Sequence, residues 1–134
     1  MSMKKIHTDN APAAIGPYTQ AYKAGDLLFI SGQGGVIPET GMIVDGGIAG
    51  QTEQAAKNLH AILSQAGADF SNVIKTTCFL ADMNDFRAFN GVYEKYFVKA
   101  GAQLRGGQRA SHGYIVRDRA RRLFGRMTGR SAFR

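Results

Sequence analysis

The stretch Asn72-Val-Ile-Lys-Thr-Thr-Cys-Phe-Leu-Ala81 decides the fold that this sequence predicts. It is apolar and rich in β-branched residues, which is typical of a central strand. Helical patterns flank it on both sides. Before it, apolar side chains recur at helical spacing up to a natural stop at Gly67, at Ile48, Ala55, Leu59, Ile62, Leu63 and Ala66. After it, Asn84 or Asp85 is placed to cap a second helix with an aromatic side made of Phe86, Phe89, Tyr93, Tyr96 and Phe97.

The chain before the first helix reads as short strands. Residues 4–8 predict a first strand, and residues 18–24 and 27–31 predict a β-hairpin closed by the tight turn Gly25-Asp26. A glycine-rich loop follows, with a short strand around residues 42–44. This order of elements predicts an α+β sandwich, with two helices packed on one face of a mixed β-sheet. Such a unit needs more strand after the second helix, because the central strand is otherwise an exposed edge.

Composition indicates one globular domain. The chain has 134 residues, of which 44% are hydrophobic, so it can build one core. We expect no secretion signal, and the longest charge-free apolar stretch, residues 27–38, is too short to span a membrane. The single Cys78 cannot form an internal disulfide, and its place in a predicted strand favours a buried, inert thiol over a nucleophile. These features predict a cytoplasmic protein.

The charge is distributed unevenly along the chain. Residues 1–100 carry eight basic and nine acidic side chains, a net charge of −1. Residues 101–134 carry nine arginines against Asp118 and contain no lysine, a net charge of +8. The sequence therefore divides into a domain over residues 1–100 and an aberrant arginine-rich segment over residues 101–134.

Four phrases in the first part carry a family resemblance. They are Asn10-Ala-Pro-Ala-Ala-Ile-Gly-Pro-Tyr18, Ser31-Gly-Gln33, Val73-Ile-Lys-Thr-Thr-Cys-Phe-Leu80 and Asp85-Phe-Arg-Ala-Phe-Asn90. Together, over about residues 5–98, they resemble the reactive-intermediate deaminases, the Rid or YjgF-type family formerly labelled translation inhibitors or endoribonucleases. The resemblance implies a chorismate-mutase-like (bacillary type) α+β fold and a homotrimer with clefts between subunits. It also implies hydrolysis of 2-imino or enamino acids to 2-keto acids and ammonia, without metal or cofactor.

This chemistry sets requirements for the pocket. The α-carboxylate of the substrate calls for an arginine, and an acceptor must orient the attacking water. By resemblance, Tyr18 lines the cleft, the Ser31 hydroxyl and the Gly32 backbone face the ligand, and Asn90 shapes the same pocket. Each residue also has a structural interpretation. Tyr18 is then a strand aromatic at a subunit contact, Ser31-Gly32 a strand end and turn, and Asn90 an exposed helix residue. No catalytic residue is assigned.

Other kinds of site find little support in the sequence. The histidines His7, His60 and His112 have no partners at ligand spacing, and we interpret His60 as a partly buried packing residue beside the first helical stripe. Gly32-Gln-Gly-Gly35 lacks the Lys-Ser/Thr of a phosphate-binding loop. We therefore expect no metal and no cofactor.

The family pattern stops near residue 100. By resemblance, Pro-Ala-Arg-Ser with the carboxylate-binding arginine should follow the second helix. A Leu-Pro turn and a Glu-Ile-Glu strand with the water-orienting glutamate should come next, and none of these stands here. Codons 102–119 shifted forward by one base permit Arg-Ser-Phe-Ala-Val-Ala-Ser-Val-Leu-Pro-Thr-Asp-Thr-Leu-Cys-Glu-Ile-Glu. In that frame Met127-Thr128 forces a stop. We hypothesise a frameshift near residues 98–102.

If the arginine-rich segment is genuine, the function changes. Arg105 lies near the expected arginine but has different neighbours, no glutamate follows Glu94, and the sheet is expected to lose its last two strands. The chain is then an impaired deaminase or a non-catalytic small-molecule-binding trimer. Another alternative is binding of RNA or an anionic surface, less favoured, through a basic amphipathic helix over residues 116–127.

Sequencing the gene across codons 95–130 tests the frameshift hypothesis. We expect a one-base shift to restore Arg-Ser-Phe through Glu-Ile-Glu ahead of a stop codon. Codons that exclude this alternative frame contradict the hypothesis, and they would favour a binding role for the arginine-rich segment over catalysis.

Overall fold

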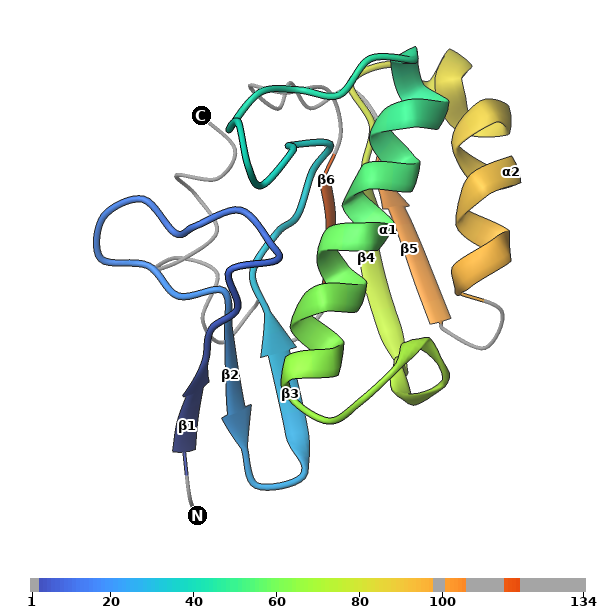
Figure 1. Ribbon diagram of the computed structural model, residues 1–134. Coiled ribbons are helices and arrows are strands. Elements are labelled where there is room, and N and C mark those ends of the chain that lie inside the picture. The colour runs from blue at the N-terminus through green and yellow to red at the C-terminus, as the bar shows by residue number, and fades with distance from the viewer. Residues whose placement is uncertain (1–2, 98–100, 106–114, 119–134) are drawn as a thin grey trace.

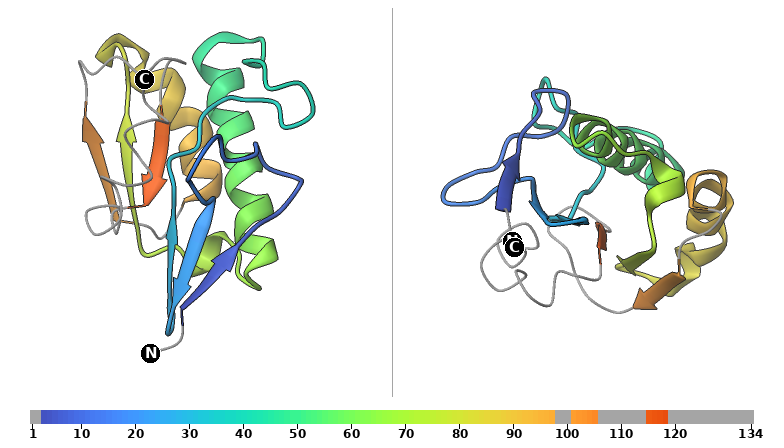
Figure 2. Two further views of the ribbon diagram at one scale, coloured as in Figure 1. Left: turned by 90° about the vertical axis from the view of Figure 1, so that its left-hand side faces the viewer. Right: turned by 90° about the horizontal axis from the view of Figure 1, so that it is seen from below.

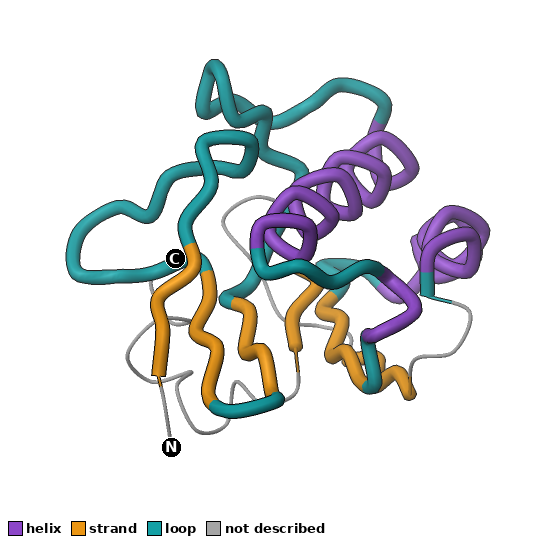
Figure 3. Tube along the Cα trace, turned by 60° about the horizontal axis from the view of Figure 1, so that its bottom comes forward, coloured by secondary structure: helices purple, strands orange, loops and turns teal. Residues whose placement is uncertain are grey.

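The computed structural model describes residues 3–97, 101–105 and 115–118. Strands β1 (Met3–Ile6), β2 (Ala21–Ala24) and β3 (Leu27–Ile30) form an antiparallel sheet in that order. Strand β4 (Lys75–Phe79) pairs in parallel with β5 (Gly101–Arg105) and antiparallel with β6 (Ile115–Asp118). Because β6 also lies beside β3, the two sheets continue one another as a single layer (Figure 3).

Two helices cover one face of this layer. They are α1 (Gly47–Gln65) and α2 (Phe86–Tyr96), and they lie side by side (Figure 1). The two further views show the helices on one side and the strands on the other (Figure 2). The predicted α+β architecture, a mixed sheet with two helices on one face, is therefore confirmed. No helix within the described ranges is long and apolar enough to cross a membrane.

The predicted hairpin is present but shorter than expected. Ala24 pairs with Leu27, and Gly25, with φ +59°, takes the first position of the two-residue turn between them. A positive φ at this position matches the right-handed twist of the two strands. Strand β2 starts only at Ala21, so Tyr18 lies in the preceding loop. The strand predicted around residues 42–44 is reduced to one antiparallel bridge between Val36 and Ile43.

The stripe of α1 faces the core as predicted. Ala55, Leu59, Ile62 and Leu63 on this stripe are each no more than 4% exposed. They pack against the inner face of the sheet and against α2, in one cluster with Leu80 and Phe89. The helix ends at Gln65, and Gly67 adopts φ +79° just beyond it. This left-handed glycine is the expected stop signal.

Helix α2 keeps its aromatic side but begins differently from the prediction. Phe89, Tyr93 and Phe97 are buried, whereas Phe86 remains 41% exposed. Asp85 occupies the N-cap position without a side-chain hydrogen bond. Instead, the carboxylate of Asp82 accepts a hydrogen bond from the N–H of Asn84 at 2.9 Å and caps the 3-10 turn η2 (Met83–Asp85) that leads into the helix.

Aromatic rings join α1 to α2 through the 3-10 turn η1 (Phe70–Asn72). The ring of Phe70 lies 5.2 Å from that of Tyr96 and 5.0 Å from that of Phe97, measured between centroids. His60 stacks on the same Phe70 at 5.7 Å but is exposed. The interpretation of His60 as partly buried was therefore wrong, because Phe70 covers only one face of the imidazole. The Tyr96 hydroxyl donates to Glu53 and adds a polar link between the helices.

The sheet does not lose its last two strands as the sequence analysis expected. Residues 101–105 and 115–118 pair with the two edges of β4. Backbone pairing requires no particular side chain, so an altered sequence can still satisfy the backbone groups of this strand. The predicted basic helix is wrong at its start, since residues 115–118 form β6, and its remainder lies outside the described residues. The boundary at residue 100 stays a prediction.

Two glycines inside helices allow a matched stability test. A Cβ at Gly50 would lie 2.2 Å from the carbonyl oxygen of Asp45, whereas a Cβ at Gly91 would meet nothing within 4 Å. We expect Gly50→Ala to lower the free energy of unfolding by about 1–3 kcal/mol through overpacking. We expect Gly91→Ala to raise it by about 0.5–1 kcal/mol through backbone entropy. Urea unfolding measures both, and equal effects of the same sign would contradict this packing.

Candidate functional site

Tyr18 is held by a tight turn in the loop before β2. Its backbone N–H donates to the carbonyl oxygen of Gly16 at 2.9 Å, which closes a three-residue turn around Pro17. Gly16 has φ +78°, and a Cβ there would lie 3.5 Å from the Tyr18 ring. The Tyr18 side chain is half-buried. The interpretation of Tyr18 as a strand aromatic was wrong, since the residue lies outside β2.

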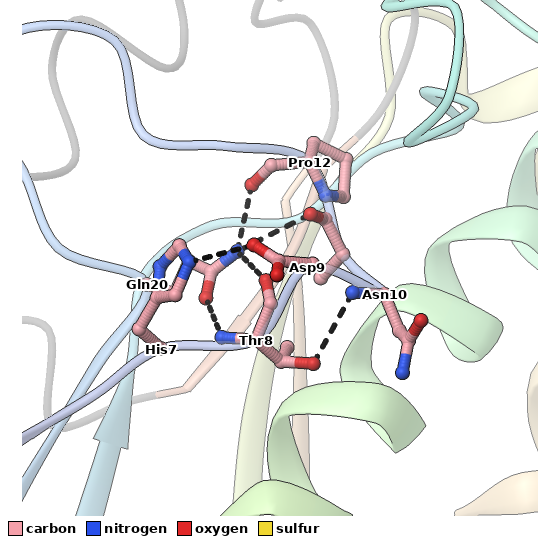
Figure 4. A network of polar contacts seen from close by, with 7 residues as sticks. His7, Thr8, Asp9, Asn10, Pro12 and Gln20 are labelled. Carbon is pink, nitrogen blue, oxygen red and sulfur yellow. Dashed lines mark hydrogen bonds and ion pairs between the residues drawn. The ribbon is translucent and has the colours of Figure 1, made fainter.

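Gln20 fixes the first part of this loop from inside (Figure 4). Its side-chain oxygen accepts from the N–H of Thr8 at 2.8 Å, and its side-chain nitrogen donates to the Thr8 carbonyl at 3.0 Å. The same nitrogen reaches the carbonyl oxygens of Ala11 at 3.3 Å and Pro12 at 2.9 Å. Gln20 is only 3% exposed. One amide group therefore contacts four buried or half-buried backbone groups outside the strands, with its two N–H groups shared among three carbonyl oxygens.

Ser31 is tied to the same segment. Its N–H donates to the carbonyl oxygen of Gln20 at 2.9 Å, and its hydroxyl donates to the carbonyl oxygen of Thr19 at 2.7 Å. Ser31 and Gly32 follow β3 directly and are half-buried. The structure thus brings Ser31 and Gly32 next to the Tyr18 loop, as the resemblance implied. Their contact with a ligand stays a prediction.

Asn58 positions the glycine-rich segment that follows. It is fully buried on α1, and its side-chain nitrogen donates to the carbonyl oxygens of Gly34 at 3.1 Å and Val36 at 2.8 Å. Gly35 lies against the helix backbone, since a Cβ there would be 2.8 Å from the Cα of Gln51. This close approach requires glycine. The chain beyond Ser31 and Gly32 is therefore anchored to α1.

Asn90 lies on a different side of the molecule. It is half-buried on α2, and α1 separates that helix from the 10–20 loop in the views of Figures 1 and 2. A buried hydrogen bond between the hydroxyls of Thr76 and Tyr93 fixes α2 against β4. Within one chain, the structure therefore does not bring Asn90 together with Tyr18 and Ser31. Asn90 is half-buried, so the alternative interpretation of Asn90 as an exposed helix residue is met only in part.

Two buried groups at the contact between α2 and β4, the Cys78 thiol and the Tyr93 hydroxyl, have raised pKa values. Burial raises the pKa of the Cys78 thiol to about 12, and the thiol is 1% exposed. Burial also raises the pKa of the Tyr93 hydroxyl to about 12. Both groups therefore stay protonated at neutral pH, so Cys78 is not a thiolate nucleophile. The prediction of a buried, inert thiol is confirmed.

The described ranges contain no group of three or more histidine, cysteine or acidic side chains placed to hold a metal. Within these ranges, His7 and Asp9 form a histidine–carboxylate pair on the surface, with 3.0 Å between Nε2 and Oδ1. Its two side chains are 66% and 98% exposed, so solvent screens the interaction. This pair offers no enclosed acid–base site.

Sequence reasoning missed two residues that shape the site. Asn58 falls on the buried face of α1 between Ala55 and Ile62, and a polar residue on an apolar stripe is a readable signal. Gln20 gives no such signal. Its role depends on a loop conformation that its own side chain creates.

Comparison with known proteins now places the chain. A family model described as "Endoribonuclease L-PSP" matches residues 8–106. The chain belongs to this family. A mouse protein named 2-iminobutanoate/2-iminopropanoate deaminase is 53% identical over 94 residues, which are 70% of this chain and 70% of the mouse protein. An Arabidopsis thaliana protein named Reactive Intermediate Deaminase A, chloroplastic, is 53% identical over 98 residues, which are 72% of this chain and 52% of the plant protein.

Solved structures of similar proteins agree with the fold. The structure of E. coli TdcF with bound serine has a TM-score of 0.76 and 32% sequence identity, and the match covers 87% of this chain and 98% of that chain. The recognition of a Rid or YjgF-type protein and its chorismate-mutase-like fold are therefore confirmed. The chain spans about half the length of the plant relative.

The Gln20 contacts predict a large effect of substitution. Gln20→Leu leaves buried carbonyl groups and one N–H without partners, so we expect the free energy of unfolding to fall by about 3 kcal/mol. Gln65→Leu, at an exposed position on α1, is the matched control and should change it by less than about 0.5 kcal/mol. Chemical denaturation measures both. Similar small losses would show that the loop does not depend on the amide.

Gln20→Glu adds a pH dependence of known sign. Burial raises the pKa of a carboxyl group, so the folded variant binds more protons than the unfolded variant. Its stability should therefore fall as the pH rises above about 4.3, the ordinary value for glutamate.

Proposed function

We propose that the chain is built to hydrolyse reactive 2-imino or enamino acids to 2-keto acids and ammonia. The observation that carries this proposal is the joining of the Tyr18 loop and Ser31 at one place by Gln20 and Thr19. The deaminase names of the mouse and plant relatives, which share about half of their aligned residues with this chain, support it. Serine bound to TdcF supports an amino-acid-like ligand.

The site is proposed to lie between subunits of a homotrimer. Hydrogen bonds to Thr19 and Gln20 join Ser31 to the segment beside Tyr18, while Asn90 lies on α2, which α1 separates from the 10–20 loop in Figure 1. If all four predicted site residues contact one ligand, Asn90 must come from a neighbouring copy. This separation supports a cleft shared by two subunits.

The segment after α2 leaves two chemical requirements open. An imino acid carries a carboxylate, which an arginine binds best, and its C=N carbon needs a water that an acceptor orients. Arg105 ends β5 and pairs in register with Phe79 at the end of β4. No glutamate follows Glu94 in the sequence. We therefore propose that this exact chain is impaired, and the end of the family match at residue 106 supports the frameshift hypothesis.

A non-catalytic binding trimer is the second candidate. The missing glutamate favours it, because Tyr18, Ser31 and Asn90 would still contact a small molecule. Binding of RNA through the arginine-rich segment ranks lower. The described histidine–acid pair is exposed and supports no ribonuclease chemistry. We propose a cytoplasmic protein that acts on small molecules, without metal or cofactor.

Hydrolysis of 2-iminobutanoate, generated in situ by oxidation of 2-aminobutanoate, tests the proposed function. Release of ammonia and 2-oxobutanoate is measured for this chain and for the version with the shifted reading frame. We expect the shifted-frame version to accelerate release and this chain to be at least about tenfold slower, because it lacks the acceptor for water. No acceleration by either version would reject the deaminase function.

A mixing experiment tests the shared cleft. Subunits carrying Tyr18→Ala and subunits carrying Asn90→Ala are each expected to be weak alone. If Tyr18 and Asn90 come from different copies, mixed trimers contain some clefts with both residues intact, and activity partly returns. No recovery after verified subunit exchange would place both residues in one protomer.

A further inference from the structure

Strand β1 is the outermost strand of its sheet. It lies at one end of the strand order β1-β2-β3, and in the described part of the chain it pairs on one side, with β2 (Figure 1). Met3, Lys4 and Lys5 are exposed there, whereas Ile6 is buried. An edge strand presents a row of backbone N–H and C=O groups that can pair with another extended chain. Such an edge is therefore a place where a peptide can be added as a further strand.

Three exposed lysines surround this edge. Lys4 and Lys5 lie on β1, and Lys23 lies directly opposite Lys4 on β2. The cross-strand neighbour of Lys5 is Tyr22, so neither lysine of β1 is opposite an acid. The sequences of β1, β2 and β3 contain these three lysines and no acidic residue. Because like charges directly opposite each other destabilise a strand pair, the Lys4–Lys23 pair is unfavourable in the protein alone.

Lysines on an edge strand commonly prevent the edges of two copies from pairing. That role accounts for Lys4 and Lys5, because two copies joined through β1 would bring their lysines together. It does not account for Lys23, because β2 lies between β1 and β3 and is not an edge of this sheet. An acidic side chain beside Lys4 would instead offset the repulsion between Lys4 and Lys23. The charges therefore favour an acidic partner over a second copy of this chain.

We propose that β1 is a docking strand for an extended acidic segment of another protein, which pairs with β1 in antiparallel orientation. On β1, Met3 and Lys5 lie on one face of the sheet and Lys4 lies on the other. Met3 and Leu27 both lie in register with Ala24, and they are 56% and 52% exposed. The segment should therefore carry acidic residues opposite Lys5 and Lys4 and an apolar residue opposite Met3. This inference does not depend on the proposed deaminase function.

Synthetic peptides test the docking strand. A peptide with the core Val-Glu-Glu-Leu, written from its N-terminus, places its glutamates opposite Lys5 and Lys4 and its leucine opposite Met3. Its dissociation constant is measured by calorimetry for the unaltered full chain and for Lys4→Glu. We expect Lys4→Glu to weaken this peptide by roughly tenfold and to strengthen a peptide with the core Val-Lys-Lys-Leu, because attraction and repulsion are exchanged. The variant should fold, since it creates an opposite-charge pair with Lys23.

Two controls separate strand addition from general attraction between charges. Lys57→Glu makes the same charge change at an exposed position on α1, and it should alter binding of the Val-Glu-Glu-Leu peptide by less than about twofold. In an added strand, alternate backbone N–H groups point to β1 and the others point away from it. We therefore expect N-methylation of one alternate set of peptide nitrogens to weaken binding by roughly tenfold, and methylation of the other set to leave it nearly unchanged.

Four results would overturn the docking strand. The first is no binding of the Val-Glu-Glu-Leu peptide at millimolar concentration. The second is binding that is unaffected by Lys4→Glu but absent from the shifted-frame version, which would place the peptide on the arginines of residues 101–134. The third is equal binding of both methylated peptides, which would show attraction between charges without an added strand. The fourth is a change of assembly size in Lys4→Glu, measured by sedimentation, which would identify a second copy as the occupant of β1.

Discussion

The arrangement of the N-terminal half depends on the hydrogen bonds of two adjacent residues, Thr19 and Gln20. The Gln20 side chain holds the backbone of Thr8, Ala11 and Pro12, and the two main-chain carbonyls of Thr19 and Gln20 hold Ser31. The segments joined in this way lie up to 12 residues apart in sequence. Because these residues form no ladder with a strand in the described part of the chain, their backbone groups depend on this amide.

This hydrogen-bond network is rigid because its buried carbonyl and N–H groups are paired. An unpaired buried carbonyl or N–H costs about 1–3 kcal/mol, so the loop cannot shift without losing several such bonds at once. A loop fixed in this way is already ordered, so binding of any ligand to it would cost little additional conformational entropy. Asn58 extends the same principle to the glycine-rich segment, where two carbonyls are bound from α1. Buried polar side chains thus fix the conformation of the loops, while the apolar stripe of α1 fixes how the helix packs on the sheet.

The layers were predictable from the sequence, and the loops were not. The stripe from Ala55 to Leu63 and the aromatic side of α2 repeat at helical period, so their burial follows from spacing alone. The turn at Gly25 is similarly local. The predicted start of β2 at Tyr18 was wrong. Tyr18 has high strand propensity, but the hydrogen bonds of Gln20 hold the chain in a loop, so the strand begins only at Ala21. Strands β5 and β6 were missed because pairing with β4 uses the backbone, which side-chain patterns do not report.

The candidate site was likewise predictable in its residues but not in its geometry. Tyr18, Ser31 and Gly32 were named by resemblance, and their proximity in the fold depends on main-chain carbonyls that no motif encodes. The hydrogen bonds that hold them join residues between 8 and 31. Loss of the family motif from the segment after α2 would remove the arginine and the glutamate but none of these hydrogen-bonding residues. The network around Tyr18 and Ser31 and the arginine and glutamate of the family motif are therefore supplied by different parts of the sequence.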